Sequence, residues 1–189
     1  FPELCITGYT CGDLFAQQLL LEEAEMGLMQ ILNNTRQMDI ISILGMPVPL
    51  NGVLLNTAVV IQKGKILGVV PKTYLPNYKE FYEKRWFVSA DLKTCEKIPI
   101  LGREVPFSEN LLLKGRNDVV IGTEICEDLW VADTPATAHA LEGATILVNL
   151  SASNETVGKA QYRELLVKAA SARLLCGYVY ASAGEGEST

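Results

Sequence analysis

The stretch GTEICEDLW, Gly122 to Trp130, places one cysteine directly after an apolar run and surrounds it with three acids. The run DVVIGTEIC, residues 118–126, is typical of a buried strand that ends at Cys126. A cysteine acts as a nucleophile through its thiolate, and nearby carboxylates disfavour that form. Cys126 is therefore either an inert core thiol or a nucleophile whose base and cation come from elsewhere in the chain.

The composition is that of an ordinary globular domain, with 189 residues of which 49% are hydrophobic, enough for one sizeable core. The net charge of -6 and the lack of a Lys/Arg stripe argue against nucleic acid or an anionic membrane surface as partner. No apolar run approaches the ~20 residues of a membrane span, and no signal peptide is visible. The cysteines have no CxxC spacing and indicate reduced thiols in a cytoplasmic protein, without a zinc site: Cys5, Cys11, Cys95, Cys126 and Cys176.

Predicted helices and strands alternate along the chain. The helices share apolar residues at helical spacing and cover 14–32, 134–144 and 155–175. The strands are short apolar runs at 39–48, 118–126, 145–153 and 177–184, with a hairpin over 56–72 that turns at Lys63-Gly64-Lys65. Residues 73–110 are predicted to be irregular, and a loop of that length is typically functional. This order favours a single α/β domain with a mixed sheet covered by helices.

Three polar residues share one placement, at the end of a predicted strand. Glu3 follows the expected first strand, Lys72 follows ILGVVP, and Cys126 follows DVVIGTEI. Because strand ends meet at one edge of an α/β sheet, we expect these side chains to converge. The Lys72 ammonium would then favour the thiolate, and Glu3 would act as the base. Each residue also has a plainer interpretation: a core thiol, a solvated lysine and a surface acid or helix cap.

The single histidine of the chain, His139, lies in the alanine-rich predicted helix over 134–144. We expect it to be a surface or packing residue. A Cys–His pair is therefore not the expected chemistry of Cys126.

Together, three stretches resemble the nitrilase superfamily, the carbon–nitrogen hydrolases: FPE (1–3), PKTYLPNYKEF (71–81) and GTEICEDLW (122–130). The resemblance implies an α-β-β-α sandwich and a catalytic triad of Glu3, Lys72 and Cys126. A second glutamate in the lysine loop supports the triad in many family members. Glu80 is the expected counterpart here, with Glu83 as the competing choice.

The chain is similar, from its first residue to its last, to the glutaminase domains of glutamine-dependent NAD+ synthetases. The stretches concerned are FPELCITGYTCGDLF, PKTYLPNYKEFYEKRWF, ICEDLW, NLSASN and YVYASAGEGEST. The resemblance implies L-glutamine as substrate, a thioester on Cys126, and an oxyanion held by Lys72 and the N–H of Glu127. The glutamine-pocket positions of the family map onto Tyr9, Tyr78, Glu127, Trp130, Ser153 and Lys159.

Lys159 falls where relatives often have arginine, so carboxylate recognition would be less strict geometrically. The alternative for Lys159 is a solvated lysine at the start of a helix. Both interpretations remain open from the sequence.

The resemblance makes 1–189 one glutaminase domain, and we expect it to be incomplete at both ends. It would lack its first strand and the C-terminal synthetase domain, where ATP with Mg and deamido-NAD+ would be substrates. No phosphate-loop motif occurs here, and no cofactor is expected in this domain. Relatives form homo-oligomers. The alternatives are a stand-alone amidase or nitrilase acting on another small amide or a nitrile, a non-catalytic nitrilase-like module, and a partial chain that folds poorly.

Overall fold

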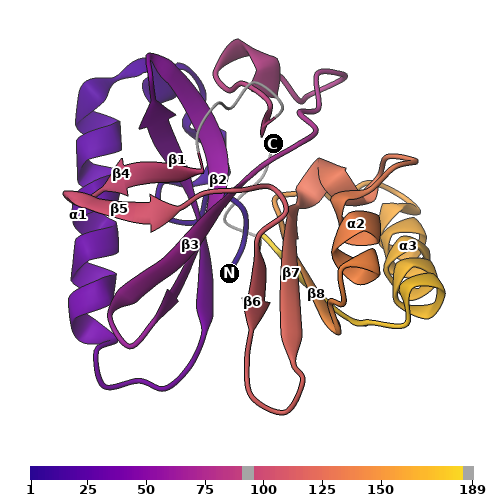
Figure 1. Ribbon diagram of the computed structural model, residues 1–189. Helices are drawn as coiled ribbons and strands as arrows, with labels where there is room; N and C mark the ends of the chain where they lie inside the picture. Colours follow the sequence, from indigo (N-terminus) through magenta and orange to yellow (C-terminus); the bar gives the residue numbers. More distant parts are fainter. Residues whose placement is uncertain (91–95, 185–189) are drawn as a thin grey trace.

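The computed structural model describes residues 1–90 and 96–184, so Cys95 and residues 185–189 of the GEGEST segment lie outside the described residues. Two β-sheets face each other, and helices cover their outer faces (Figure 1). The first residues of the chain run between the two sheets, and the backbone nitrogen of Phe1 donates a hydrogen bond to the carbonyl of Ile43 at 3.0 Å. The N-terminal turn that carries Glu3 therefore lies inside the sandwich.

The first sheet is an antiparallel meander of three strands. They are β1 (Ser42–Leu50), β2 (Val53–Gln62) and β3 (Lys65–Pro71), in the order β1-β2-β3. The β2–β3 hairpin turns at Lys63 and Gly64, both with positive φ, as the sequence predicted. Helix α1 (Gln18–Asn34) packs on the outer face of this sheet (Figure 1).

The second sheet is mixed and has the order β6-β7-β8-β9. Strand β6 (Leu112–Lys114) pairs antiparallel with β7 (Val120–Ile125), whereas β8 (Ile146–Ser151) and β9 (Gly177–Ser182) continue in parallel. Helices α2 (Pro135–Leu141) and α3 (Lys159–Leu174) cover its outer side (Figure 1). The helices that connect the parallel strands lie on one face of the sheet. The turns that follow these strands therefore lie at the edge formed by the carboxyl ends of the strands.

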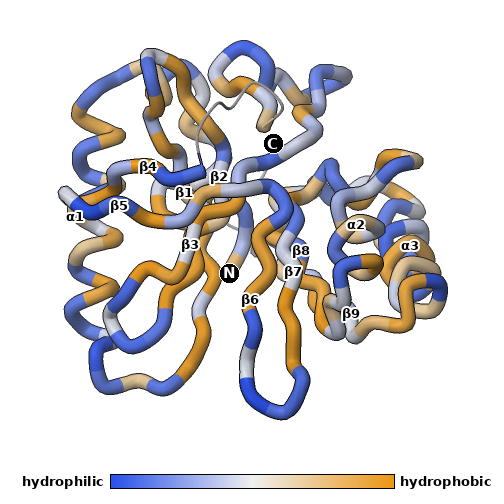
Figure 2. Tube along the Cα trace, in the orientation of Figure 1, coloured by the Kyte–Doolittle hydropathy of each residue, from blue (hydrophilic) through white to orange (hydrophobic). Residues whose placement is uncertain are grey.

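Hydrophobic residues fill the space between the sheets. Ala58, Val60 and Val70 of the first sheet pack in one cluster with Ile125 and Leu150 of the second. Burying each Val, Leu or Ile contributes about 1.5–3 kcal/mol relative to exposure. Because β1 to β3 are covered by the second sheet on one face and by α1 on the other, their sequences read as continuous apolar runs (Figure 2).

The prediction that residues 73–110 are irregular was wrong for 97–106, which form a hairpin of β4 (Lys97–Ile100) and β5 (Arg103–Pro106). Pro99 lies within β4, although a proline has no N–H to donate to a neighbouring strand. It occupies an exposed position of β4, where the missing N–H costs little, while Ile98 and Ile100 point into the core. Strand β6 was also not predicted.

Two predicted helices begin later than their apolar spacing indicated. Residues Tyr9–Ala16 form a 3-10 segment, η1, with a non-helical Gly12, so α1 begins only at Gln18. Helix α3 begins at Lys159 because Gly158 adopts φ 81, a left-handed conformation that interrupts a helix. Among the described residues, none of the helices combines the length and apolar character required to cross a membrane.

His139 lies in α2 with 1% of its surface exposed, which makes it a packing residue and not a surface one. Its Nε2 donates to the carbonyl of Glu109 at 2.9 Å, and its ring lies against Gly122, where a Cβ would come within 2.8 Å of it. Among the described residues, Nδ1 has no hydrogen-bond partner. Burial therefore lowers the pKa of His139 to about 4.

The His139 contribution to the free energy of unfolding is expected to disappear as the pH falls from 6.5 towards 4. In this window the unfolded imidazole binds a proton and the folded one does not, so acidification favours unfolding by roughly 3 kcal/mol. Urea unfolding of the wild type and of His139→Gln at several pH values measures this. The stability of the wild type relative to the variant should decline on acidification, and a pH-independent difference would contradict the assignment.

Candidate active site

The Lys72 ammonium is fully buried between two carboxylates. Its Nζ lies 2.6 Å from Oε1 of Glu3 and 2.6 Å from Oε1 of Glu83, and none of the three side chains is more than 1% exposed. Lys72 directly follows β3, and its backbone N–H donates to the carbonyl of Asn56 at 2.8 Å. Burial opposes the charged ammonium, but the two carboxylates outweigh it and raise the pKa of Lys72 well above its ordinary value.

Glu3 is fixed by three donors, which leaves its carboxylate a single orientation. Oε1 accepts from Lys72 and from Nδ2 of Asn56, the latter at 2.7 Å, while Oε2 accepts from the backbone N–H of Ala152 at 3.1 Å. Ala152 follows β8 of the second sheet, so Glu3 ties both sheets together. The expected convergence of the N-terminal turn with the end of β3 is observed.

Of the two glutamates proposed to support Lys72, the structure places Glu83 there and not Glu80. Glu83 begins the short 3-10 turn η2 (Glu83–Arg85), and it also accepts from the hydroxyl of Tyr9 at 2.8 Å. Burial raises the pKa of Glu83 to about 7, while Lys72 opposes the rise. Glu80, the expected residue, is exposed and accepts a hydrogen bond from Asn154. Of the two glutamates, Glu83 is therefore the one that contacts Lys72, and its supporting role stays a prediction.

Cys126 occupies a sharp turn between β7 and the 3-10 turn η4 (Cys126–Leu129). Its φ of 46° lies in the left-handed region, which costs a non-glycine residue of the order of 1–2 kcal/mol. Its N–H donates to Oδ1 of Asn149 at 3.1 Å, and Oγ of Ser151 lies 3.3 Å from Sγ. Burial and the negative charge of Glu3 raise the pKa of this thiol, while Lys72 lowers it. The resting group is therefore a thiol, and a base must accept its proton.

Two of the three acids around Cys126, Glu124 and Asp128, accept hydrogen bonds from other groups, whereas Glu127 lines the same cavity as the cysteine. Glu124 accepts from the N–H of Ala136 at 3.0 Å and from the hydroxyl of Tyr178, on the α2 side of the sheet. Asp128 accepts from the N–H of Ile125 at 2.9 Å and from that of Tyr74 at 2.8 Å. Asp128 thereby connects the cysteine turn to the loop that follows Lys72, and burial raises its pKa to about 8.

A cavity of about 300 Å³ is lined by Cys126 and by most of the predicted glutamine-pocket residues. Those that line it are Tyr78, Glu127, Trp130, Ser153 and Lys159. Tyr9 contacts Glu83 instead and is not among its lining residues. The Lys159 Nζ lies 5.4 Å from the ring centroid of Phe81 and 5.3 Å from that of Trp130, so it is half enclosed by aromatic faces rather than free in solvent.

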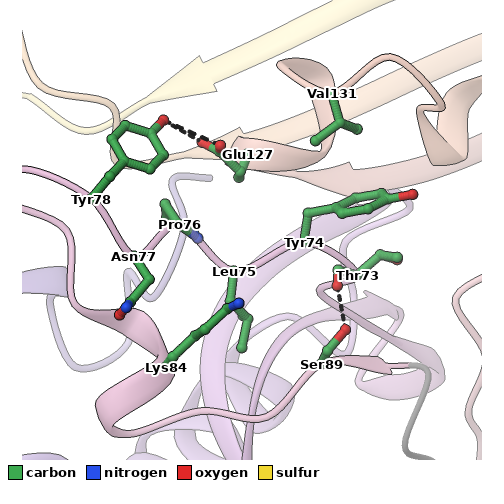
Figure 3. Close-up of a pocket in the computed structure, with 10 residues that line it drawn as sticks. All are labelled: Thr73, Tyr74, Leu75, Pro76, Asn77, Tyr78, Lys84, Ser89, Glu127 and Val131. Carbon is green, nitrogen blue, oxygen red and sulfur yellow. Dashed lines mark hydrogen bonds between the residues drawn. The ribbon is translucent and has the colours of Figure 1, made fainter.

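The Tyr78 hydroxyl donates to the Glu127 carboxylate at 3.0 Å (Figure 3). Both residues also line a second cavity of about 540 Å³, together with Lys84 and Ser89, but Cys126 does not line it. The Tyr78–Glu127 pair thus lies between the larger cavity and the one that holds the cysteine. Burial raises the pKa of Tyr78 to about 12, with the Glu127 charge adding to the effect.

Three buried polar residues of the site were not identified from the sequence: Asn56, Asn149 and Ser151. Each interrupts an apolar strand, and Asn149 and Ser151 stand two positions apart on β8, so they share one face of the sheet. The sequence signal that could have identified them is a polar residue within an otherwise apolar strand. Within the described ranges, no group of three or more His, Cys, Asp or Glu side chains is arranged to hold a metal ion.

Comparison with known proteins gives a consistent result. The carbon-nitrogen hydrolase family matches residues 1–187. The chain is 44% identical to the glutamine-dependent NAD(+) synthetase of Mycobacterium tuberculosis, over 100% of this chain and 28% of that protein. A glutamine-dependent NAD(+) synthetase structure from Cytophaga hutchinsonii matches with a TM-score of 0.83 and 35% identity, over 96% of this chain and 29% of that one. A nitrilase-superfamily amidase from Nesterenkonia has the same fold, with a TM-score of 0.73 and 18% identity over 96% of this chain and 61% of that one.

The chain therefore belongs to the carbon–nitrogen hydrolase family, and the expected α/β sandwich of the nitrilase type is confirmed. Within that family its similarity to glutamine-dependent NAD(+) synthetases is also confirmed. The chain spans 28% of the length of the curated Mycobacterium relative.

Asp128→Ala is expected to lower the free energy of unfolding by about 2–4 kcal/mol, because the N–H groups of Ile125 and Tyr74 lose their acceptor. Asp133→Ala truncates an exposed aspartate and should change it by less than about 0.5 kcal/mol. Chemical denaturation of both variants measures the two effects. Equal losses would show that the Asp128 carboxylate does not hold the two segments together.

Proposed function

We propose that this chain hydrolyses the side-chain amide of L-glutamine to L-glutamate and ammonia. One observation carries the proposal: Cys126 lines a cavity whose other lining groups include the Lys159 ammonium and the Glu127 carboxylate. Lys79 and Glu80 also line this cavity but are exposed, so Lys159 and Glu127 are its less exposed charged groups. A buried unpaired charge is costly, and this pair therefore suits a substrate that carries both charges. The α-carboxylate would bind Lys159 and the α-ammonium would bind Glu127. This arrangement distinguishes an amino-acid amide from a simple amide or nitrile.

The other pocket residues have supporting roles in this proposal. Tyr78 orients Glu127 through the hydrogen bond between them. Trp130 forms an aromatic wall beside Lys159, and Ser153 contributes a buried hydroxyl. Tyr9 acts through Glu83, since its hydroxyl donates to that carboxylate.

The proposed reaction has two half-reactions. Glu3 accepts the proton of Cys126 as Sγ attacks the amide carbon, and the same proton then passes to the leaving nitrogen, so that the C–N bond breaks with release of ammonia. A γ-glutamyl thioester remains on Cys126. Water, deprotonated by Glu3, attacks the thioester carbon. The C–S bond breaks, and the proton held by Glu3 returns to Sγ.

The oxyanion of each tetrahedral intermediate needs fixed donors. We assign this role to the Lys72 ammonium and to the backbone N–H of Glu127, which follows the nucleophile in the turn η4. Glu3 and Glu83 each lie 2.6 Å from the ammonium, and these two contacts fix its position. Glu83 also keeps Lys72 charged after Glu3 has taken up a proton. The proposal thus gives the two carboxylates different roles around one cation.

In the whole protein, we infer that ammonia passes to a C-terminal synthetase domain. That domain would use ATP with Mg to convert deamido-NAD+ to NAD+. The names of the relatives and the 28% share of their length support this inference. A homo-oligomer and a cytoplasmic location belong to the same proposal, and the free thiols of Cys5, Cys126 and Cys176 suit a reducing compartment.

A glutamine-like diazoketone tests the substrate and the nucleophile together. Intact mass and peptide mapping of the full-length protein should show one adduct, on Cys126, which excess L-glutamine suppresses and excess butyramide does not. Suppression by butyramide alone would favour a simple amidase. An adduct on another cysteine, or none on a folded protein, would contradict the proposed function.

Replacing Glu83 separates the two glutamates of the lysine loop. Glu83→Gln should lower kcat for glutamine hydrolysis by about 10²-fold, because the Lys72 ammonium loses its second fixed partner and its position. Glu80→Gln is the matched comparison three residues earlier, and it should retain kcat because Glu80 does not contact Lys72; any effect should fall on KM, since Glu80 lines the cysteine cavity. Steady-state kinetics of both variants show which of the two glutamates supports Lys72 in turnover. A larger loss for Glu80→Gln would restore the original assignment.

A further inference from the structure

Ser151 makes three hydrogen bonds at the end of β8, and none of them has a role in the mechanism above. Its Oγ lies 3.3 Å from Sγ of Cys126, 2.5 Å from the hydroxyl of Tyr180 and 3.1 Å from the backbone nitrogen of Ser153. Ser151 is fully buried, with 0% of its surface exposed. Its hydroxyl therefore has a fixed set of neighbours.

The direction of these bonds follows from the capacity of a hydroxyl, which has one donor and two acceptor sites. The backbone N–H of Ser153 can only donate, so it occupies one lone pair of Ser151. Tyr180 donates to the other. The single proton of Ser151 is then left to point at Sγ of Cys126. A donor aimed at sulfur stabilises the thiolate relative to the thiol.

Tyr180 is held in place by its surroundings. It lies on β9, next to β8, in register with Asn149, and its ring lies 5.8 Å from the guanidinium carbon of Arg163 on α3. Arg163 in turn pairs with Glu155. The phenol is therefore positioned by the sheet and by α3, and burial keeps its pKa above the ordinary value, so it remains a donor.

We propose that Ser151 is a further catalytic residue, whose hydroxyl donates to Sγ of Cys126 as the thiolate forms, and that Tyr180 is the positioning residue that orients it. The S–H bond breaks and its proton goes to Glu3, while Ser151 and Tyr180 keep their protons throughout. The inference rests on the proposed function for its role in turnover. The hydrogen bond itself concerns the thiol and can be measured without glutamine.

The electrostatic surroundings of Cys126 remain the same when Ser151 is replaced. The ionisable groups that act on this thiol come from the N-terminal turn, the 3-10 segments, the ends of β3 and β7, the lysine loop, β9 and α3. They are the carboxylates of Glu3 and Glu83, the ammonium groups of Lys72 and Lys159, and the phenols of Tyr9, Tyr78 and Tyr180. Three further charged groups share the cavity with Cys126: Lys79, Glu80 and Glu127. A change in the titration of the thiol in Ser151→Ala therefore reports the lost hydroxyl.

The test is the pH dependence of alkylation of Cys126 by iodoacetamide in the full-length protein, followed by peptide mass. Only the thiolate reacts. Ser151→Ala should shift the profile to higher pH by about one unit, because a hydrogen bond to a charged group is worth about ten-fold in the ionisation equilibrium. Tyr180→Phe should shift it by less. The double variant should match Ser151→Ala, since Tyr180 acts through Ser151.

Ser171→Ala is the matched control. It removes a hydroxyl that donates to the carbonyl of Cys176 at 2.7 Å, at the far end of α3, and it should leave the profile of Cys126 unchanged. If Ser151→Ala does not fold, Tyr180→Phe carries the test, because it removes one oxygen from a partly exposed residue. A folded Ser151→Ala variant with the wild-type profile would overturn the proposal. Additive shifts in the double variant would overturn the role of Tyr180.

Discussion

The structure depends on one buried charge, the Lys72 ammonium, and on the two carboxylates that compensate it. An ion of this kind without partners costs several kcal/mol in a protein interior, so Glu3 and Glu83 must both reach it when the chain folds. Glu3 comes from the N-terminal turn and Glu83 from the loop after β3. Two regions that are distant in sequence, the N-terminal turn and the end of β3 with its following loop, are thereby brought to one point between the sheets.

The nucleophile is held by a second group of buried polar contacts. Cys126 sits in a left-handed turn that Asn149 and Asp128 support through backbone N–H groups, and its sulfur faces Ser151. The strain and the buried polar groups reduce the stability that the sheets supply through their apolar faces. In return, the thiol, its base and the cation are fixed before a substrate binds. Burial keeps the thiol protonated before the reaction begins. The proton therefore passes to Glu3 as the sulfur attacks the substrate.

The apolar runs were sufficient for the α/β class and for the residues that directly follow strands, because they show where strands end. Lys72 and Cys126 were found in this way. The same runs predicted one mixed sheet, and the sandwich of two facing sheets was implied only by the family resemblance. Glu83 could not be distinguished from Glu80, since the path of an irregular loop decides which carboxylate turns inward. Ser151 and Asn149 were missed because a polar residue on a buried strand looks the same in sequence whether it faces water or a cysteine. The β4–β5 hairpin was missed because the exposure of Pro99 depends on tertiary packing.

The central claim is that Cys126 accepts a glutamyl group with Lys72 and Glu3 acting on it from fixed positions. The most direct test is to mix the full-length protein with L-glutamine, quench it in acid within one turnover, and measure the intact mass. The account predicts a glutamyl adduct on Cys126 in the wild type and none in a folded Lys72→Met variant. Release of glutamate by the wild type with no adduct on Cys126 at any quench time, or an adduct of equal yield in Lys72→Met, would contradict it.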